Sequence, residues 1–294
     1  MFRVQFRRMI QSLGFKIAFS FMMIFCMFAL VQGVIACRTM DLSAVPDANT
    51  MYCGFGSGNM WTYFTVFFPF VIVLPFATSF IQDVQSRAVL PVWVRGTFPG
   101  YLLSKLVVSF LGGILVIGIP FFVNLVLCNL IFPHNHNVLF GEYGLHNYYG
   151  LLTGSRQIYS SLQAAAPNME LYMQNPFLCN LFYLALLSIF AGLMSAVLMV
   201  LSFFLKKRKI ILFFPFFIFW YGASVLTEFS YTDAVADMSV PFLNIEYMDY
   251  LAPLTLHGGW IPGYLAGLCV IFLAFIAVAF FYAKRHALKY IQEG

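Results

Sequence analysis

The sequence predicts an all-α integral membrane protein with six transmembrane helices, an amphipathic interfacial helix before the first of them, and both termini in the cytoplasm. Three observations predict this fold. Of 294 residues, 62% are hydrophobic and only 9% are charged, whereas a soluble domain carries about 25% charged residues. Six apolar stretches are each long enough to cross a bilayer. The basic residues, finally, gather on one side of these stretches.

This composition excludes several classes of protein. With so few charged side chains the chain cannot cover a water-facing surface, which argues against a soluble enzyme, a nucleic-acid-binding module and a disordered protein. The formal net charge of +5 does not indicate a nucleic-acid partner, because the basic residues follow membrane orientation. We expect the chain to lie in the lipid bilayer as a multi-pass protein of the cell membrane.

The first element expected is a short helix over residues 1–14. Phe2, Phe6 and Leu13 recur at helical spacing, with arginines between them. This pattern is typical of an amphipathic helix that lies in the cytoplasmic interface, with its basic residues near anionic headgroups. The alternative interpretation is a plain basic anchor before the first span.

The spans follow from length and apolar character. A spanning helix needs about 20 mostly apolar residues. The stretches that satisfy this condition are 15–37, 60–81, 101–132, 177–205, 210–229 and 260–283. We expect the long third and fourth stretches to be tilted, broken or extended beyond the hydrocarbon core.

The charges provide an independent check on this topology. With six spans, every one of the 16 basic residues except Arg38 and Arg156 falls on one face. The positive-inside rule assigns that face to the cytoplasm. The acidic residues show the reverse distribution, since only Asp83 and Glu293 fall inside.

The sequence contains few residues that indicate catalysis, ion transport or nucleotide binding. The centres of the spans lack the ionisable residues that ion-driven transporters place in the membrane. The Gly-x-x-x-x-Gly-Lys-Ser/Thr phosphate-binding loop is absent. We therefore expect no catalytic residue, cofactor or metal in this chain, and we interpret His134, His136 and His146 as polar loop residues rather than metal ligands.

The cytoplasmic segment 82–98, between the second and third spans, is short, amphipathic and mixed in charge. Asp83 and Arg87 are spaced as an i,i+4 pair on one helical face. Gly96 and Pro99 end the segment before the chain re-enters the membrane. A short exposed helix at this place suits docking into the groove of a partner, and the alternative is an ordinary connecting loop.

At this segment the chain resembles the permease subunit of an ABC-2 type ABC transporter, which has the type V exporter fold. Such permeases have an interfacial helix, six spans and a coupling helix between spans two and three. In them an acidic residue opens the coupling segment and a Tyr-Leu-Leu-x-Lys-like motif begins the third span. Asp83 and Tyr101–Lys105 stand at those places. Ser86 with Arg87, where many members carry Gly, and the interrupting Pro91 depart from the pattern.

The resemblance implies the membrane pathway for ATP-driven export of a hydrophobic or amphipathic substrate, such as a peptide, lipid or drug. It implies two kinds of partner: a cytoplasmic ABC ATPase subunit, which binds ATP and Mg, and a second permease copy or a paralogue. The residues expected to couple to the ATPase are Asp83, Gln85, Arg87, Leu90, Trp93 and Arg95.

The expected pathway is aromatic. Its candidate residues lie in the second and fifth spans and are Phe64, Phe67, Phe68, Phe213, Phe214, Phe217 and Trp220. Pro69, Pro75 and Pro215 mark sites where these spans can bend. Gly112, Gly113 and Gly118 in the third span permit a close approach of another helix.

The outer loops are expected over 133–176 and 230–259. The second of them interleaves aromatic and acidic residues, and by likeness to ABC-2 permeases it forms short re-entrant helices that cap the exit. The gate candidates are then Phe242, Tyr247, Tyr250 and Leu251; the alternative is a loop resting on the headgroups. The first can form a lid over the exit.

Cys37 and Cys53 flank the loop after the first span and can form a disulfide, although spacing alone does not fix the connectivity.

Two other functions remain open from the sequence. One is a non-transporting membrane scaffold or sensor subunit that docks a cytoplasmic partner. The other is a secondary carrier, against which the ion-poor spans argue.

Overall fold

The computed structural model describes residues 1–41, 45, 47–52, 59–86, 98–134, 171, 174–204, 209–236, 245–251 and 261–285. The described part of the chain consists of helices and turns and contains no β-strand. The α-helices are α1 (Phe2–Gln11), α2 (Leu13–Cys37), α3 (Asn59–Val71), α4 (Ser79–Gln85), α6 (Phe98–Ile131), α9 (Pro176–Leu201), α10 (Pro215–Ala236) and α11 (Tyr264–Arg285). Two short 3₁₀ helices are η2 (Lys209–Phe213) and η3 (Asp249–Leu251).

Five helices in the described residues are long and apolar enough to cross a membrane. They are Leu13–Cys37, Phe98–Ile131, Pro176–Leu201, Ile210–Ser230 and Tyr264–Arg285. They match five of the six predicted stretches to within a few residues, as expected of a multi-pass membrane protein. The longest, α6, rises about 51 Å at 1.5 Å per residue, so it exceeds the ~30 Å hydrocarbon core.

The second predicted span, 60–81, is not one continuous helix, and this part of the prediction is wrong. Helix α3 ends at Val71, residues 72–78 form turns, and α4 resumes at Ser79. The physical reason is Pro75, which has no N–H to donate and disfavours helical backbone at the residue before it. The predicted bend at this proline is therefore a complete interruption.

The N-terminal helix is present but shorter than predicted, and its place in the membrane interface stays a prediction. Helix α1 ends at Gln11 because Ser12 takes an extended conformation and begins the next helix. The Ser12 hydroxyl accepts a hydrogen bond from the Phe15 N–H at 3.2 Å, which is how a serine caps a helix N-terminus.

Glycines let α6 and α9 pack closely, as the sequence predicts for α6. A Cβ on Gly113 would lie 2.6 Å from the Ala191 carbonyl oxygen, and a Cβ on Gly192 would lie 2.7 Å from the Phe110 carbonyl oxygen. A Cβ on Gly118 would lie 2.9 Å from the Ser188 hydroxyl. Larger residues at these positions would force the two helices apart, so this pair forms the centre of the bundle.

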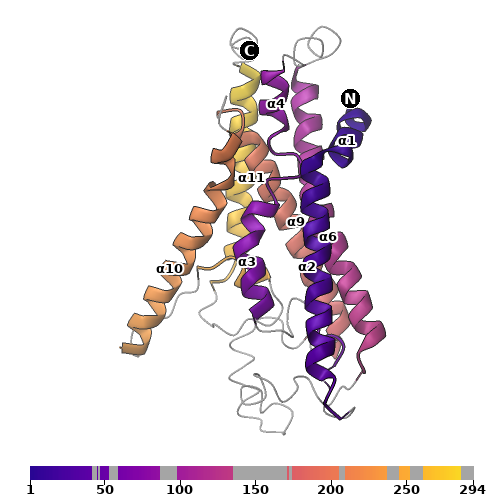
Figure 1. The fold of residues 1–294 in the computed structure, drawn as a ribbon. Coiled ribbons are helices and arrows are strands. Elements are labelled where there is room, and N and C mark those ends of the chain that lie inside the picture. Colours follow the sequence, from indigo (N-terminus) through magenta and orange to yellow (C-terminus); the bar gives the residue numbers. More distant parts are fainter. Residues whose placement is uncertain are drawn as a thin grey trace.

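Helices α2, α6, α9 and α11 run side by side along the bundle, whereas α10 leans away from it towards Ala236 (Figure 1). The start of the chain, at α1, and the end of α11 lie at the same end of the bundle (Figure 1). We call this the α1 end. The opposite end holds the last turns of α2 and α6 and the first turn of α9.

Candidate functional site

Asp83 is the centre of a buried ion-pair cluster at the α1 end. It lies on α4 and is 2% exposed. Its Oδ1 lies 2.8 Å from Nη1 of Arg8 on α1, and its Oδ2 lies 2.9 Å from Nζ of Lys105 on α6. The Tyr101 hydroxyl donates a hydrogen bond to Oδ2 at 2.6 Å. One carboxylate therefore joins three helices that are distant in sequence. We call Arg8, Asp83, Tyr101 and Lys105 the ion cluster.

Lys105 is fully buried, with 0% exposure. Its ammonium group donates to the Ser79 hydroxyl at 2.9 Å in addition to its ion pair with Asp83. It also lies over the rings of Phe76 and Tyr101, at 4.9 and 5.4 Å from their centroids. Such cation–π contacts stabilise a cation that has lost its water. The side chain is thus surrounded by the partners that an intramembrane charge requires.

The helix α4 supplies both groups that receive Lys105. Ser79 begins this short helix and Asp83 follows one turn later, so both side chains lie on the face that packs against α6. Tyr101 and Lys105 have the same spacing on α6. Each helix thus presents two polar side chains four residues apart to the other helix. The site forms at α4 because this helix packs its polar face against α6.

The charges in the cluster hold Asp83 ionised. The ion pairs with Lys105 and Arg8 and the hydrogen bond from Tyr101 all favour the ionised form of the Asp83 carboxyl. The cluster then carries two cations and one anion at neutral pH. Arg8 reaches the surface, since its side chain is 52% exposed.

Packing around the interruption at 72–78 fixes α1 in place. Met9 is fully buried against Gly112 of α6, where a Cβ would lie 2.8 Å from the Met9 sulfur and 3.2 Å from Cβ of Pro75. The Ser12 hydroxyl donates to the Pro75 carbonyl at 3.3 Å. A Cβ on Gly14 would collide with the Leu74 carbonyl oxygen. The α1–α2 junction therefore rests directly on the broken span.

The coupling residues predicted from sequence fall in three places. Gln85 is exposed at the end of α4. Asp83 is in the interior rather than on an exposed docking face, and among the described residues it pairs with Arg8 and Lys105. The i,i+4 pairing of Asp83 with Arg87 stays a prediction. Arg87, Leu90, Trp93 and Arg95 lie outside the described residues.

The predicted pathway residues do not line one space within the chain. Phe64 and Phe68 are buried and pack in the core, where the Phe64 ring lies 4.9 Å from that of Phe121. Phe67 and Phe214 are exposed on the outside of the bundle. Phe213, Phe217 and Trp220 are half-buried, and Phe217 contacts Phe70 of α3 at 5.2 Å between ring centroids.

The described part of the predicted outer gate packs into the bundle. Tyr247 is fully buried and stacks on Phe219 of α10 at 5.4 Å, while its ring lies 5.6 Å from Phe190 of α9. Leu251 is also buried. The Tyr250 hydroxyl accepts a hydrogen bond from the Ile261 N–H at 2.9 Å. Phe242 lies outside the described residues.

The two cysteines of the predicted disulfide are described only in part. Cys37 is half-buried at the end of α2. Cys53 lies outside the described residues, so their pairing stays a prediction. Most of the 133–176 loop, from residue 135 to 170, also lies outside them.

A second polar cluster, at the end opposite α1, has no counterpart in the sequence predictions. The Asn180 side chain of α9 donates to the Asn49 carbonyl at 3.0 Å, and the Asn129 side chain of α6 donates to the Asn49 Oδ1 at 3.4 Å. Asp47 accepts from both the backbone and the side-chain N–H of Asn49, at 2.9 and 3.0 Å. We call Asp47, Asn49, Asn129 and Asn180 the amide cluster.

Sequence reasoning missed the pairing within the ion cluster. Tyr101 and Lys105 stand out as polar residues at the start of a long apolar stretch, and a charge at such a place needs a partner. That signal points to an acid, and Asp83 is the nearest one on the same side. No local signal points to Arg8, because its contact depends on how α1 docks.

The chain matches no family model, no curated protein and no solved structure. The functional argument consequently rests on the geometry of the site.

Proposed function

We propose that the chain is the membrane subunit of an ABC-2 type ABC transporter. In this proposal it crosses the cell membrane six times, with the α3–α4 region as the broken second span and both termini in the cytoplasm. With a second copy or a paralogue it forms the pathway for export of a hydrophobic or amphipathic substrate. A separate ABC ATPase subunit supplies the energy by binding and hydrolysing ATP with Mg.

The ion cluster is the observation that carries this proposal. Asp83 stands where the cytoplasmic segment 86–97 leaves α4, and its carboxylate contacts both α1 and α6 within 2.9 Å. A force applied to that segment would act on both helices together. This is what a coupling element requires, since movement of an ATPase must reach the membrane helices.

The close α6–α9 contact extends this path. Because backbone atoms of α6 and α9 meet at Gly113 and Gly192, α9 would move with α6 rather than slide independently. Helices α10 and α11, whose outward faces carry many exposed apolar side chains, have less contact with this unit. The pathway formed with the second copy would then open as α10 moves relative to the α6–α9 unit.

The broken second span is compatible with a crossing of the bilayer. Helix α3 rises about 20 Å and α4 about 10 Å, and residues 72–78 join them. Interrupted helices are tolerated at membrane depth where their backbone is buried in protein. Residues Ile72, Val73, Phe76 and Ala77 are buried, and the Pro75 carbonyl accepts from Ser12.

The first test is co-purification of the full chain with an ABC ATPase encoded by a neighbouring gene. The proposal expects a stable complex and cargo flux in proteoliposomes that requires ATP. A complex that moves no cargo would indicate the scaffold function instead. Flux driven by a pH or sodium gradient without the ATPase would indicate a secondary carrier.

The second test uses a variant that removes the coupling without leaving a buried charge. Asp83→Asn combined with Lys105→Met neutralises the buried pair together. We expect the ATPase to bind within about twofold of the wild type, and cargo-stimulated hydrolysis to fall at least about tenfold, which corresponds to 1.4 kcal/mol of lost coupling. Asp41→Asn, an exposed acid at the opposite end, is the matched control. Normal stimulation in the double variant would contradict the coupling role.

A further inference from the structure

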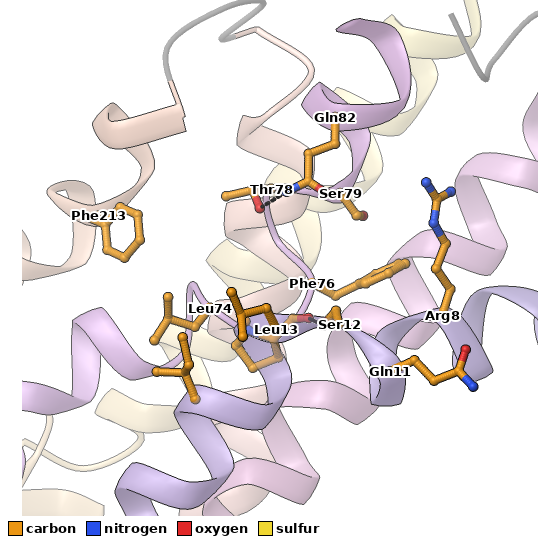
Figure 2. Close-up of a pocket in the computed structure, with 13 residues that line it drawn as sticks. Arg8, Gln11, Ser12, Leu13, Leu74, Phe76, Thr78, Ser79, Gln82 and Phe213 are labelled. Carbon is orange, nitrogen blue, oxygen red and sulfur yellow. Dashed lines mark hydrogen bonds between the residues drawn. The ribbon is translucent and has the colours of Figure 1, made fainter. Parts of the chain in front are cut away.

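A cleft of about 650 Å³ opens between the α1–α2 junction and the broken second span. Figure 2 shows that Arg8 and Gln11 come from α1, Leu13 from the start of α2, and Thr78 and Gln82 from the α4 side, with Phe213 of η2 across the opening. The cleft opens to the surface of the bundle beside α1. The ion cluster uses only one edge of it, through Arg8.

One side of the cleft is polar and carries a cation. The side chains of Arg8, Gln11 and Gln82 are exposed there. The Arg8 guanidinium offers five N–H donors, and its contact with Asp83 uses Nη1. Gln82 donates only a long bond, 3.4 Å, to the Thr78 hydroxyl. Arg8 and Gln82 offer a charged and a neutral donor to a phosphate group, whereas the Gln11 side chain points away from Gln82 (Figure 2).

The other side of the cleft is apolar and continues down the outside of α2. Leu13 is 74% exposed and Ile17 is 50% exposed. From there an unbroken stripe of exposed apolar side chains follows α2 at helical spacing: Phe21, Ile24, Phe28, Val31 and Ile35. A molecule with a polar head in the cleft would therefore have a continuous apolar track for a chain.

The charge around the cleft favours an anion. Arg3, Arg7, Arg8 and Lys16 are all exposed on α1 and the first turn of α2, and the sequence has no acidic residue before Asp41. The acid beside the cleft, Asp83, is buried and already paired with Lys105. The local excess of positive charge attracts anionic headgroups in preference to zwitterionic ones.

We propose that this cleft binds one anionic glycerophospholipid. The phosphate lies at Arg8 and Gln82, and an acyl chain follows Leu13 and Ile17 onto the outer face of α2. The lipid touches both α1 and α4 and thus the helices on either side of the ion cluster. This inference requires only that the chain lies in a membrane and is independent of the transport proposal.

The test is a lipid titration of the delipidated full-length protein in a neutral detergent, followed by thermal unfolding and by native mass spectrometry. Three probes are compared: phosphatidylglycerol, phosphatidylcholine with the same acyl chains, and inorganic phosphate. A ligand that binds only the folded state raises the unfolding midpoint. We expect phosphatidylglycerol to raise it and to stay bound at one copy per chain, with at least tenfold tighter apparent binding than phosphatidylcholine.

The cleft is tested directly by Gln11→Glu combined with Gln82→Glu. Both side chains are exposed, so the fold should persist, while two acids in the lining of the cleft weaken phosphatidylglycerol binding by about thirtyfold. Gln174→Glu, an exposed glutamine before α9 at the opposite end, is the matched control and should bind as the wild type. A second variant, Leu13→Ser combined with Ile17→Ser, should abolish the preference for long over short acyl chains.

Three results would overturn the proposal. Equal protection by phosphatidylcholine would remove the charge selectivity. Equal protection by inorganic phosphate would make this a site for a free anion. Unchanged binding in both double variants would place the bound lipid elsewhere.

Discussion

The two ends of the bundle hold their polar groups by different means. At the α1 end, the ion cluster gathers two cations and one carboxylate, with Asp83 and Lys105 both buried. At the opposite end, the amide cluster contains no basic residue: the buried acid Asp47 accepts hydrogen bonds from Asn49, and Asn180 donates to the Asn49 carbonyl. Helix α6 contributes to both, through Lys105 and Asn129.

This difference predicts how much the loss of one polar partner destabilises each end. In the ion cluster, the loss of one partner leaves a charge in a low-dielectric interior, and that costs far more than the pair contributes when intact. In the amide cluster, the loss of Asn129 or Asn180 leaves one neutral oxygen of Asn49 without its donor. Substitutions in the ion cluster should therefore lower the free energy of unfolding more than substitutions of asparagines in the amide cluster.

The largest expected effect is that of Asp83→Asn. It removes the anion beside the fully buried Lys105, so we expect the free energy of unfolding to fall by about 3–5 kcal/mol. Chemical denaturation of the detergent-solubilised protein measures this. The double variant with Lys105→Met should recover most of the loss, because no buried charge is left alone. If the double variant were as unstable as Asp83→Asn, charge burial would not explain the cost.

A smaller effect is expected at the other end from Asn180→Leu. The Asn49 carbonyl loses its buried donor, which should lower the free energy of unfolding by about 1–3 kcal/mol. Asn129→Leu is the matched control, because its bond to Asn49 is longer and only part-buried, and it should cost less than about 1 kcal/mol. A cost for Asn180→Leu equal to that of Asp83→Asn would erase the contrast between the two ends.

Within the ion cluster, Arg8→Gln should be mild. Its side chain is half-exposed, and exposed ion pairs contribute about 0–1 kcal/mol because water and salt screen them. Lys105 still neutralises Asp83 in this variant. The same denaturation assay measures the change, and a loss above about 3 kcal/mol would mean that Arg8, rather than Lys105, is the principal partner.

The sequence predicted five long apolar helices to within a few residues, because a helix of that kind is recognised from a short window of apolar residues. The bounds of α2, for example, follow from an uninterrupted apolar run and from Ser12, a helix-capping residue. It predicted the close packing at Gly113 for a similar reason, since a small residue in an apolar helix has few other uses. At the break of the second span the sequence predicted only a bend. A proline in a membrane helix can either kink the helix or end it.

The candidate site was located in part. The sequence and the resemblance to ABC-2 permeases drew attention to Asp83, Tyr101 and Lys105, but on the expectation that Asp83 faces outwards. Asp83 is buried, so that expectation is wrong. Arg8 and the amide cluster escaped attention because single polar residues near helix ends are common in any membrane protein.

By itself, then, the sequence determined where five helices run that are long and apolar enough to cross a membrane, since this depends on local composition. Only the tertiary structure decided which charges meet. The docking of α1 on Gly112 and the interruption around Pro75 bring Arg8 to Asp83 and the whole of α4 to Lys105. Such contacts depend on the shapes of packed helices, and no short stretch of sequence contains them.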